Sequence, residues 1–132
     1  MGLNVELLRS SFNLVVEREP TVTKRFYDIF FTRYPQVVPM FGKNSAEKQQ
    51  EMLTGALVAV VDHLEDAPWL KSTLRSLGRK HEGYGVTPEM YGWVGECLLA
   101  AMSEVAGDDW SVEIAQAWTD AYGAIVHLTL ND

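Results

Sequence analysis

Cysteine is nearly absent from this chain of 132 residues, which contains only Cys97. A single thiol cannot form an intrachain disulfide, so the sequence is not that of a small disulfide-stapled domain and fits a reducing compartment. Cys97 lies between Glu96 and Leu98 in a helical pattern. We therefore predict a buried, inert thiol in preference to a reactive one.

Positive charge is also scarce. Eleven Lys and Arg stand against eighteen Asp and Glu, which gives a formal net charge of −7. Proteins that bind a nucleic-acid backbone need a basic face, so this balance argues against a nucleic-acid partner. The excess of acid otherwise favours solubility and says little about the fold.

Long hydrophobic runs are missing. The longest apolar stretch, Ala56–Val61, is far too short to span a bilayer, so no membrane span is expected. The N-terminus lacks a basic segment followed by an apolar core, which is the pattern of a secretory signal. We expect one soluble domain, located in the cytoplasm.

No segment alternates apolar and polar residues in the manner of a strand, whereas apolar residues recur at spacings of three and four along most of the chain. Prolines, glycines and capping residues separate these periodic segments. The apolar stretch Val37–Phe41 is short and broken by proline, and it predicts a tight turn or one 3₁₀ turn. The fold class is all-α. The six expected helices cover residues 3–18, 21–34, 45–65, 69–81 with Gly83 as C-cap, 87–105 with Thr87 as N-cap, and 111–130.

Three histidines are candidate ligands. His63 and His127 lie near helix ends, and both fit surface or edge positions. His81 lies on the apolar stripe of its helix and is followed by Gly83 and Gly85, which let the chain turn closely. On spacing alone, such a histidine is more often a satisfied core residue than a metal ligand.

Two other polar residues share apolar helix faces. Gln49 lies one turn before Leu53, and Tyr27 lies among large apolar residues. Buried amide and phenol groups need hydrogen-bond partners, and a few convergent polar groups in an apolar interior are typical of a ligand site. The alternatives are a tyrosine at the rim of the core and a solvent-facing glutamine.

Taken in order, several short motifs resemble one family across essentially the whole chain. The chain is similar to bacterial single-domain globins, including the Vitreoscilla-type haemoglobins and the haem domain of flavohaemoglobins. The matching motifs are Phe26-Tyr27, Pro35-x5-Phe41, Gln49 with Leu53, Lys80-His81 with Gly85-Val86, Tyr91-x2-Val94-Gly95-x2-Leu98-Leu99, and Ala117-Trp118-x3-Tyr122-Gly123.

The resemblance implies a three-over-three globin fold around a haem, of b type, with His81 as the proximal iron ligand. Tyr27 and Gln49 would form the distal hydrogen-bonding pair, with Leu53 as an apolar wall beside the gas. Phe41 would wedge against the haem plane. The remaining residues implied around the haem are Leu77, Lys80 (toward a propionate), Val86, Tyr91 (on the proximal side), Val94, Leu98, Trp118, Tyr122 and Ile125.

This pattern also implies a function. One neutral imidazole leaves the sixth position of ferrous iron open to diatomic gases: oxygen, and also nitric oxide or carbon monoxide. Phenol and amide donors stabilise the partial negative charge on oxygen, so tight, reversible oxygen binding with slow release is expected. The alternatives are a nitric oxide dioxygenase and a haem-based gas sensor. We expect oxygen binding to be the primary function, for storage, scavenging or delivery (oxygen transport), although slow release suits a scavenger better than a rapid carrier.

Two departures from the family pattern bear on these expectations. In the related haem domains a glutamate of the last helix pairs with the proximal tyrosine and histidine. Here that position falls just past Asp132, which could replace the glutamate only imperfectly. The sequence also contains no flavin or nicotinamide module, so catalytic turnover would need an external electron donor.

Overall fold

The computed structural model describes residues 4–41 and 45–130, and every regular element in this part of the chain is helical. The all-α prediction is therefore confirmed. The elements are α1 (Val5–Arg18), α2 (Val22–Arg33), the 3₁₀ helix η1 (Pro35–Phe41), α3 (Ala46–Asp62), α4 (Ala67–Gly83), α5 (Pro88–Ala106), the 3₁₀ helix η2 (Gly107–Asp109) and α6 (Val112–Leu130).

Side-chain caps fix where several helices begin. The Asn4 side chain accepts a hydrogen bond from the Leu7 amide at 3.2 Å, and Ser45 accepts one from the Lys48 amide at 3.2 Å. Asp66 accepts from the Trp69 amide at 3.1 Å at the start of α4. Each cap satisfies an amide that has no partner inside its helix, so these residues place the helix starts.

Two predicted C-terminal helix ends are wrong, whereas the predicted N-cap Thr87 is present. The third helix stops at Asp62, three residues before the predicted end, because the His63 amide bonds to the carbonyls of both Ala59 and Val60 and tightens the last turn. The fourth helix runs through Gly83, with Tyr84 as its C-cap, and the left-handed residue is Gly85 at φ +88°. Thr87 is an N-cap, but its side chain makes no capping hydrogen bond.

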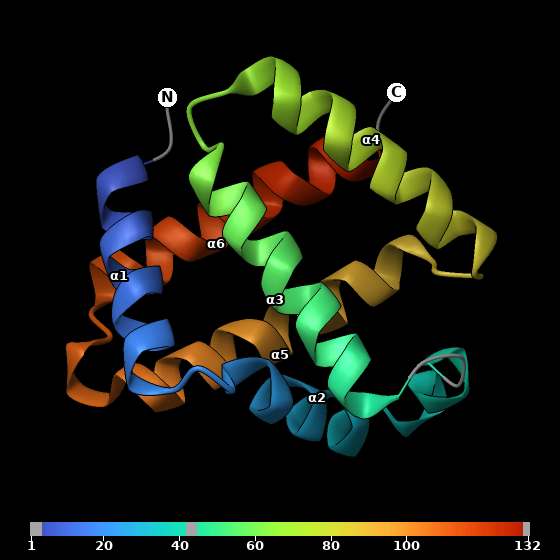
Figure 1. The fold of residues 1–132 in the computed structure, drawn as a ribbon, viewed down its shortest axis with the longest axis horizontal. Helices are drawn as coiled ribbons and strands as arrows, with labels where there is room; N and C mark the ends of the chain where they lie inside the picture. Colours follow the sequence, from blue (N-terminus) through green and yellow to red (C-terminus); the bar gives the residue numbers. More distant parts are fainter. Residues whose placement is uncertain (1–3, 42–44, 131–132) are drawn as a thin grey trace.

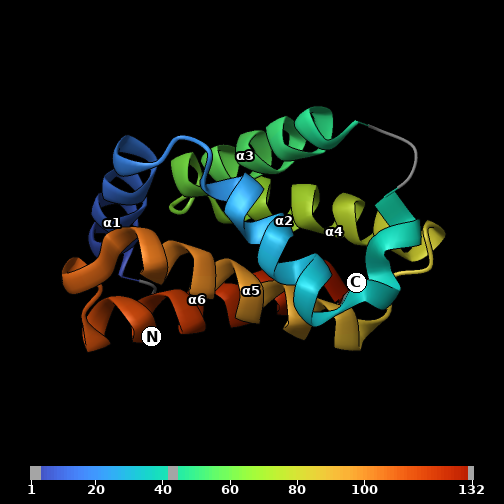
Figure 2. The ribbon, with the colours of Figure 1, turned by 90° about the horizontal axis from the view of Figure 1, so that it is seen from below.

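The helices form two layers. In Figure 1, α3 and α4 lie on the near side, with α5 and α6 behind them, and Figure 2 shows the same separation from below. Helix α5 packs mainly on α2, and α4 packs mainly on α6. Helix α3 packs on α2 and α1 instead of on α4. Helices α3 and α4 therefore lie in one layer, and α5 and α6 lie in the other.

The core lies between α1, α2 and α5. Phe26 and Phe30 stack with centroids 5.4 Å apart, and Leu8 and Val15 of α1 are fully buried. Cys97 is also fully buried, and burial raises the pKa of its thiol, which confirms the predicted buried cysteine. Across residues 4–41 and 45–130, no helix is both long and apolar enough to cross a membrane.

Two glycines allow close helix crossings. A methyl group at Gly78 of α4 would overlap the backbone carbonyl oxygen of Thr129 in α6. A methyl group at Gly95 of α5 would overlap the ring of Tyr122 in α6. Backbone cannot move aside as a flexible side chain can, so Gly78 fixes how closely α4 approaches α6.

Candidate functional site

His81 lies in the last turn of α4 and is half-buried. Its Nδ1 lies 2.8 Å from the backbone carbonyl oxygen of Leu77. A carbonyl can only accept, so Nδ1 carries the proton and donates. In the neutral ring, Nε2 then holds an unshared lone pair, which is the form of histidine that binds a metal.

Neighbouring groups define the position of the His81 ring. Leu74, two helical turns before His81, is 2% exposed. Together with the close contact between Gly78 and α6, its burial anchors α4 on the rest of the protein. The turn at Gly85 brings the start of α5 beside the ring, so that the Tyr91 ring centroid lies 6.1 Å from that of His81. The imidazole therefore sits on a fixed helix with one aromatic neighbour from the next.

Tyr27 of α2 and Gln49 of α3 are brought together, as the sequence predicted. The Gln49 amide nitrogen donates to the Tyr27 hydroxyl oxygen at 3.2 Å. Tyr27 is 8% exposed, and burial raises the pKa of its phenol, which the hydrogen bond from Gln49 lowers only in part. The phenol is thus neutral at physiological pH, and its own proton is not used in the bond to Gln49.

Phe41 ends η1 and joins the aromatic group around Tyr27. Its ring centroid lies 5.8 Å from that of Tyr27 and 5.4 Å from that of Phe31. Leu53 of α3, one turn after Gln49, is half-buried and packs against the core. Tyr27, Gln49, Phe41 and Leu53 thus form one group where α2, η1 and α3 meet.

Tyr91 and Tyr122 form a second contact, between α5 and α6. The Tyr122 hydroxyl donates to the Tyr91 carbonyl oxygen at 2.5 Å. Burial raises the pKa of Tyr122 strongly, and burial also raises that of Tyr91. Because Tyr91 neighbours His81, this hydrogen bond ties α6 to the helix start beside the histidine.

Trp118 lies elsewhere in the molecule. Its indole nitrogen donates to the Ser11 hydroxyl at 2.9 Å, and its ring lies 6.2 Å from that of Phe12. The structure thus places Trp118 between α6 and α1, where its polar group is satisfied within the protein. It does not bring Trp118 into contact with His81 or Tyr27.

The other predicted site residues differ in exposure. Lys80 is exposed and Leu98 is buried. The predicted apolar residues Leu77, Val86, Val94 and Ile125 are half-buried. Asp132 lies outside the described residues.

The two remaining histidines have different surroundings. His63 also places Nδ1 near a backbone carbonyl, that of Ala59, at 2.7 Å, but its ring stacks on Trp69 with centroids 3.8 Å apart. His127 is exposed. Within residues 4–41 and 45–130, no three His, Cys, Asp or Glu residues gather in a way that could hold a metal ion.

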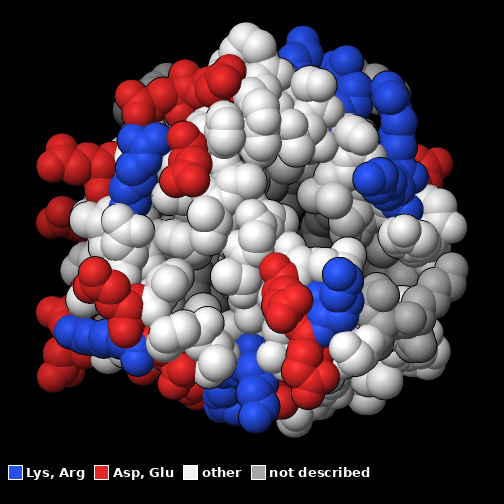
Figure 3. Space-filling model, in the orientation of Figure 1, with Lys and Arg blue, Asp and Glu red and all other residues white. Residues whose placement is uncertain are grey.

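The facing surfaces of α3 and α4 suit a flat apolar group. Along α3, Leu53, Leu57 and Val60 are only half-buried, and on α4 the same is true of Leu77. The surface is hollowed between the two helices (Figure 3). Apolar side chains left partly uncovered on two helices that flank a hollow fit a flat apolar group such as a porphyrin.

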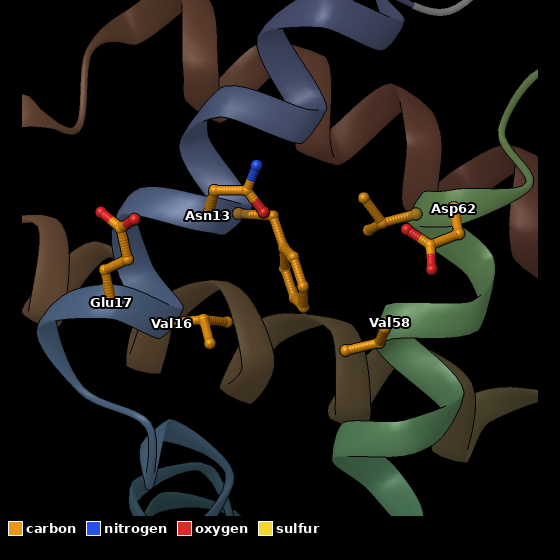
Figure 4. A pocket seen from close by; sticks show the side chains of 7 residues that line it. Asn13, Val16, Glu17, Val58 and Asp62 are labelled. Atoms are coloured by element: carbon orange, nitrogen blue, oxygen red, sulfur yellow. The ribbon is translucent and has the colours of Figure 1, made fainter.

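A separate groove of about 220 Å³ lies between α1 and α3 (Figure 4). Phe12, Val16, Val58 and Val61 line its apolar part, with Asn13, Glu17 and Asp62 among them. None of the site residues predicted from the sequence lines this groove, so it is distinct from the region around His81 and Tyr27.

Two residues that shape the site were not predicted. Gly78 lies one turn before His81, and its signal was a glycine in a helix interior, where it weakens the helix unless close packing requires it. Phe31 lies next to Tyr27 and Phe41, with its centroid 5.5 Å from that of Tyr27. Nothing in the local pattern separates Phe31 from other core aromatics.

Comparison with known proteins identifies the family. Residues 24–128 match the globin family model. The flavohemoproteins of Bacillus anthracis and Bacillus subtilis (strain 168) are 33% and 32% identical over 123 residues, or 92% of this chain. The chain spans about a third of the length of these relatives, of which the alignments cover 30% and 31%.

Solved structures agree with this comparison. A bacterial globin from Campylobacter jejuni is 27% identical with a TM-score of 0.79, over 96% of this chain and 91% of that one. An engineered carbene transferase, a candidate nitric oxide dioxygenase from Rhodothermus marinus, is 29% identical with a TM-score of 0.82, over 95% and 87% of the two chains. Globins hold haem with iron, and these solved globin structures share the all-helical fold described above. The chain belongs to the globin family.

Proposed function

We propose that this chain binds haem through His81 and takes up oxygen reversibly at the iron. Ferrous haem with one axial histidine supplies an open sixth position for a diatomic gas, and its ferric form accepts one electron to return to that state. The residues of the chain hold the haem, orient the histidine and stabilise the gas.

On the proximal side, His81 offers Nε2 to the iron. The hydrogen bond from Nδ1 to the Leu77 carbonyl fixes the tautomer and the ring direction. The close packing of α4 on α6 at Gly78 would hold the ring in place toward a bound metal. The partly uncovered apolar residues of α3 and α4 would cover the two faces of the porphyrin.

On the distal side, one observation carries the proposal. Gln49 donates to the Tyr27 oxygen, so the Tyr27 proton remains available to another acceptor in a largely apolar setting. A gas that gains negative charge at the iron is such an acceptor, and low dielectric strengthens the bond. Oxygen gains more negative charge than carbon monoxide, so this site favours oxygen.

The oxygen dissociation rate tests this proposal. Because a buried hydrogen bond contributes about 1 kcal/mol, Tyr27→Phe is expected to raise the rate roughly fivefold. Tyr34→Phe is the matched control, since its hydroxyl bonds to Glu96 at 2.7 Å, away from Gln49. An off-rate for Tyr27→Phe within about twofold of the parent and of the control would overturn the proposal.

Nitric oxide dioxygenation is the second candidate function. It needs the same stabilised oxygen, and the Rhodothermus marinus relative is itself a candidate nitric oxide dioxygenase. Repeated additions of nitric oxide to the oxygenated protein, with a reductase present, should then give nitrate over many cycles. One stoichiometric oxidation with no further turnover would leave oxygen binding as the function.

A further inference from the structure

Positive charge in this acidic protein is concentrated on α4. The helix carries four of the eleven Lys and Arg residues and only one acid, Glu82. Lys71, Arg75 and Arg79 follow one another at intervals of four, so they share one stripe of the helix, and Lys80 adjoins it. In Figure 3 blue side chains line the upper right edge, where α4 runs in Figure 1.

Arginines outside α4 are neutralised locally, whereas those of α4 are not. The pairs are Arg9–Glu65, Arg18–Asp109, Arg25–Glu104 and Arg33–Glu96. Within residues 4–41 and 45–130, no cation of α4 forms an ion pair. The Nε of Arg75 is buried without a hydrogen-bond partner there, so this guanidinium retains an unused donor.

This unpaired charge adjoins the proposed iron ligand. His81 belongs to the same helix, and Lys80 immediately precedes it. An α-helix with its side chains is about 10–12 Å across, so a protein seated on the outer face of α4 would lie roughly that far from the His81 ring. Electron transfer needs that proximity, and a local positive field steers an acidic partner to it.

We propose that the basic stripe of α4 (Lys71, Arg75, Arg79 and Lys80) is the docking surface for an acidic one-electron donor protein. The inference rests on the proposed function, because its purpose is to return ferric haem to the ferrous state. The donor loses one electron, the iron gains it, and no covalent bond forms or breaks. A donor of the iron–sulfur or flavin class supplies such an electron.

The rest of the surface favours a protein over a membrane or a nucleic acid. Outside α4 the acids far outnumber the bases, and an extended phosphate surface would be repelled by them. Among the described residues, Tyr84 at the C-cap is the one exposed large hydrophobic side chain that adjoins α4, so the helix itself presents no apolar face to insert into a bilayer. A compact acidic patch on a protein matches this short basic stripe better than an extended membrane or nucleic-acid surface does.

A charge-neutralising pair tests the docking surface. The variant combines Lys71→Gln with Arg79→Gln, both exposed and neither among the predicted site residues. The control combines Lys24→Gln with Lys48→Gln, which are exposed on α2 and α3 and change the net charge equally. The probe is a reduced plant-type ferredoxin, an acidic one-electron donor, mixed with haem-loaded ferric protein in a stopped-flow spectrometer.

The α4 variant is expected to be reduced about tenfold more slowly at low salt, and the control within about twofold of the parent. High salt should remove the difference. Calorimetry with oxidised ferredoxin should show a matching loss of affinity for the α4 variant alone. Photoreduced riboflavin, a small donor without a protein docking surface, should reduce all three proteins at nearly the same rate.

Equal ferredoxin rates for the two variants, with haem spectra intact, would overturn the docking surface and leave the proposed function standing. Salt-sensitive binding of phosphatidylglycerol vesicles that depends on α4, without any effect on ferredoxin, would assign the stripe to a membrane and also overturn it. A chain that takes up no haem would overturn both proposals.

Discussion

Helices α3 and α4 face each other across the candidate haem site, but they are held in different ways. Helix α4 buries Leu70, Leu74 and Gly78 and approaches the α6 backbone closely. Helix α3 buries only Val61, and a methyl group at its Gly55 would meet nothing within 4 Å. The helix that carries the proposed iron ligand is therefore fixed, and the helix that carries Gln49 is loosely packed.

The difference in packing between α4 and α3 suits the different roles proposed for His81 and Gln49. An iron ligand must keep its distance from the metal, whereas a hydrogen-bonding group beside a gas must adjust as the gas arrives and leaves. Tyr27, on the densely packed α2, is the fixed member of the distal pair, and Gln49 is the adjustable one. Large effects on stability are expected from α4 and small ones from α3.

The largest contrast should come from truncating one leucine on each helix. Leu74→Ala removes a side chain that is 2% exposed and should lower the free energy of unfolding by about 3 kcal/mol. Leu57→Ala on the half-buried face of α3 should cost about 1 kcal/mol. Urea unfolding of the haem-free protein measures both, and equal losses would remove the distinction between the helices.

Glycine substitutions should change stability in opposite directions. Gly78→Ala forces a methyl group onto the Thr129 carbonyl and should cost roughly 2–3 kcal/mol. Gly55→Ala fills open space within a helix and should stabilise the protein by about 0.5–1 kcal/mol. The same unfolding experiment applies. A stabilising Gly78→Ala would show that α4 is not locked on α6.

Alkaline pH should act through the buried tyrosines. Burial raises the folded-state pKa of Tyr122, so above about pH 10 the unfolded chain loses this proton first. Stability is then complete below pH 10 and falls as pH rises, by about 1.4 kcal/mol per unit for one such group. Tyr122→Phe should flatten this decline, measured as the urea midpoint between pH 9 and 11. An unchanged slope would mean that Tyr122 is not protected from ionisation.

The smallest effect should come from the adjustable member of the distal pair. Gln49→Leu leaves the Tyr27 proton in place and removes only the amide that orients the hydroxyl. The oxygen off-rate should rise about twofold, less than for Tyr27→Phe, because the direct donor contributes more than a group acting through it. Stopped-flow oxygen release checks the order, and a larger effect from Gln49→Leu would assign the direct contact to Gln49.

Local signals explain what could be predicted from the sequence. Apolar periodicity places the helices, because it acts within a few residues. The early end of α3 depends on the hydrogen bonds from the His63 amide to the carbonyls of both Ala59 and Val60. The amino-acid sequence around His63 does not predict these two bonds. The importance of Gly78 depends on Thr129, fifty residues later, so it emerged only from the packing of α4 on α6.

The site shows the same limit. The polar residues Tyr27 and Gln49 on apolar helix faces indicated a candidate ligand site, the family resemblance implied that they form a pair, and they are hydrogen-bonded to each other. Trp118 matched a family motif, but the structure places its indole against Ser11 of α1. A sequence motif can match a residue such as Trp118 to a family. The hydrogen-bond partner of its indole, however, depends on the tertiary fold.

The account depends most on His81, and haem titration of His81→Ala tests it most directly. His63→Ala is the matched control, because His63 also has Nδ1 near a backbone carbonyl. We expect His81→Ala to lose the ferrous absorption spectrum of the parent and to bind haem at least tenfold more weakly, with added imidazole restoring the spectrum. His63→Ala should match the parent. A His81→Ala protein with unchanged haem affinity and an unchanged ferrous spectrum would contradict the account.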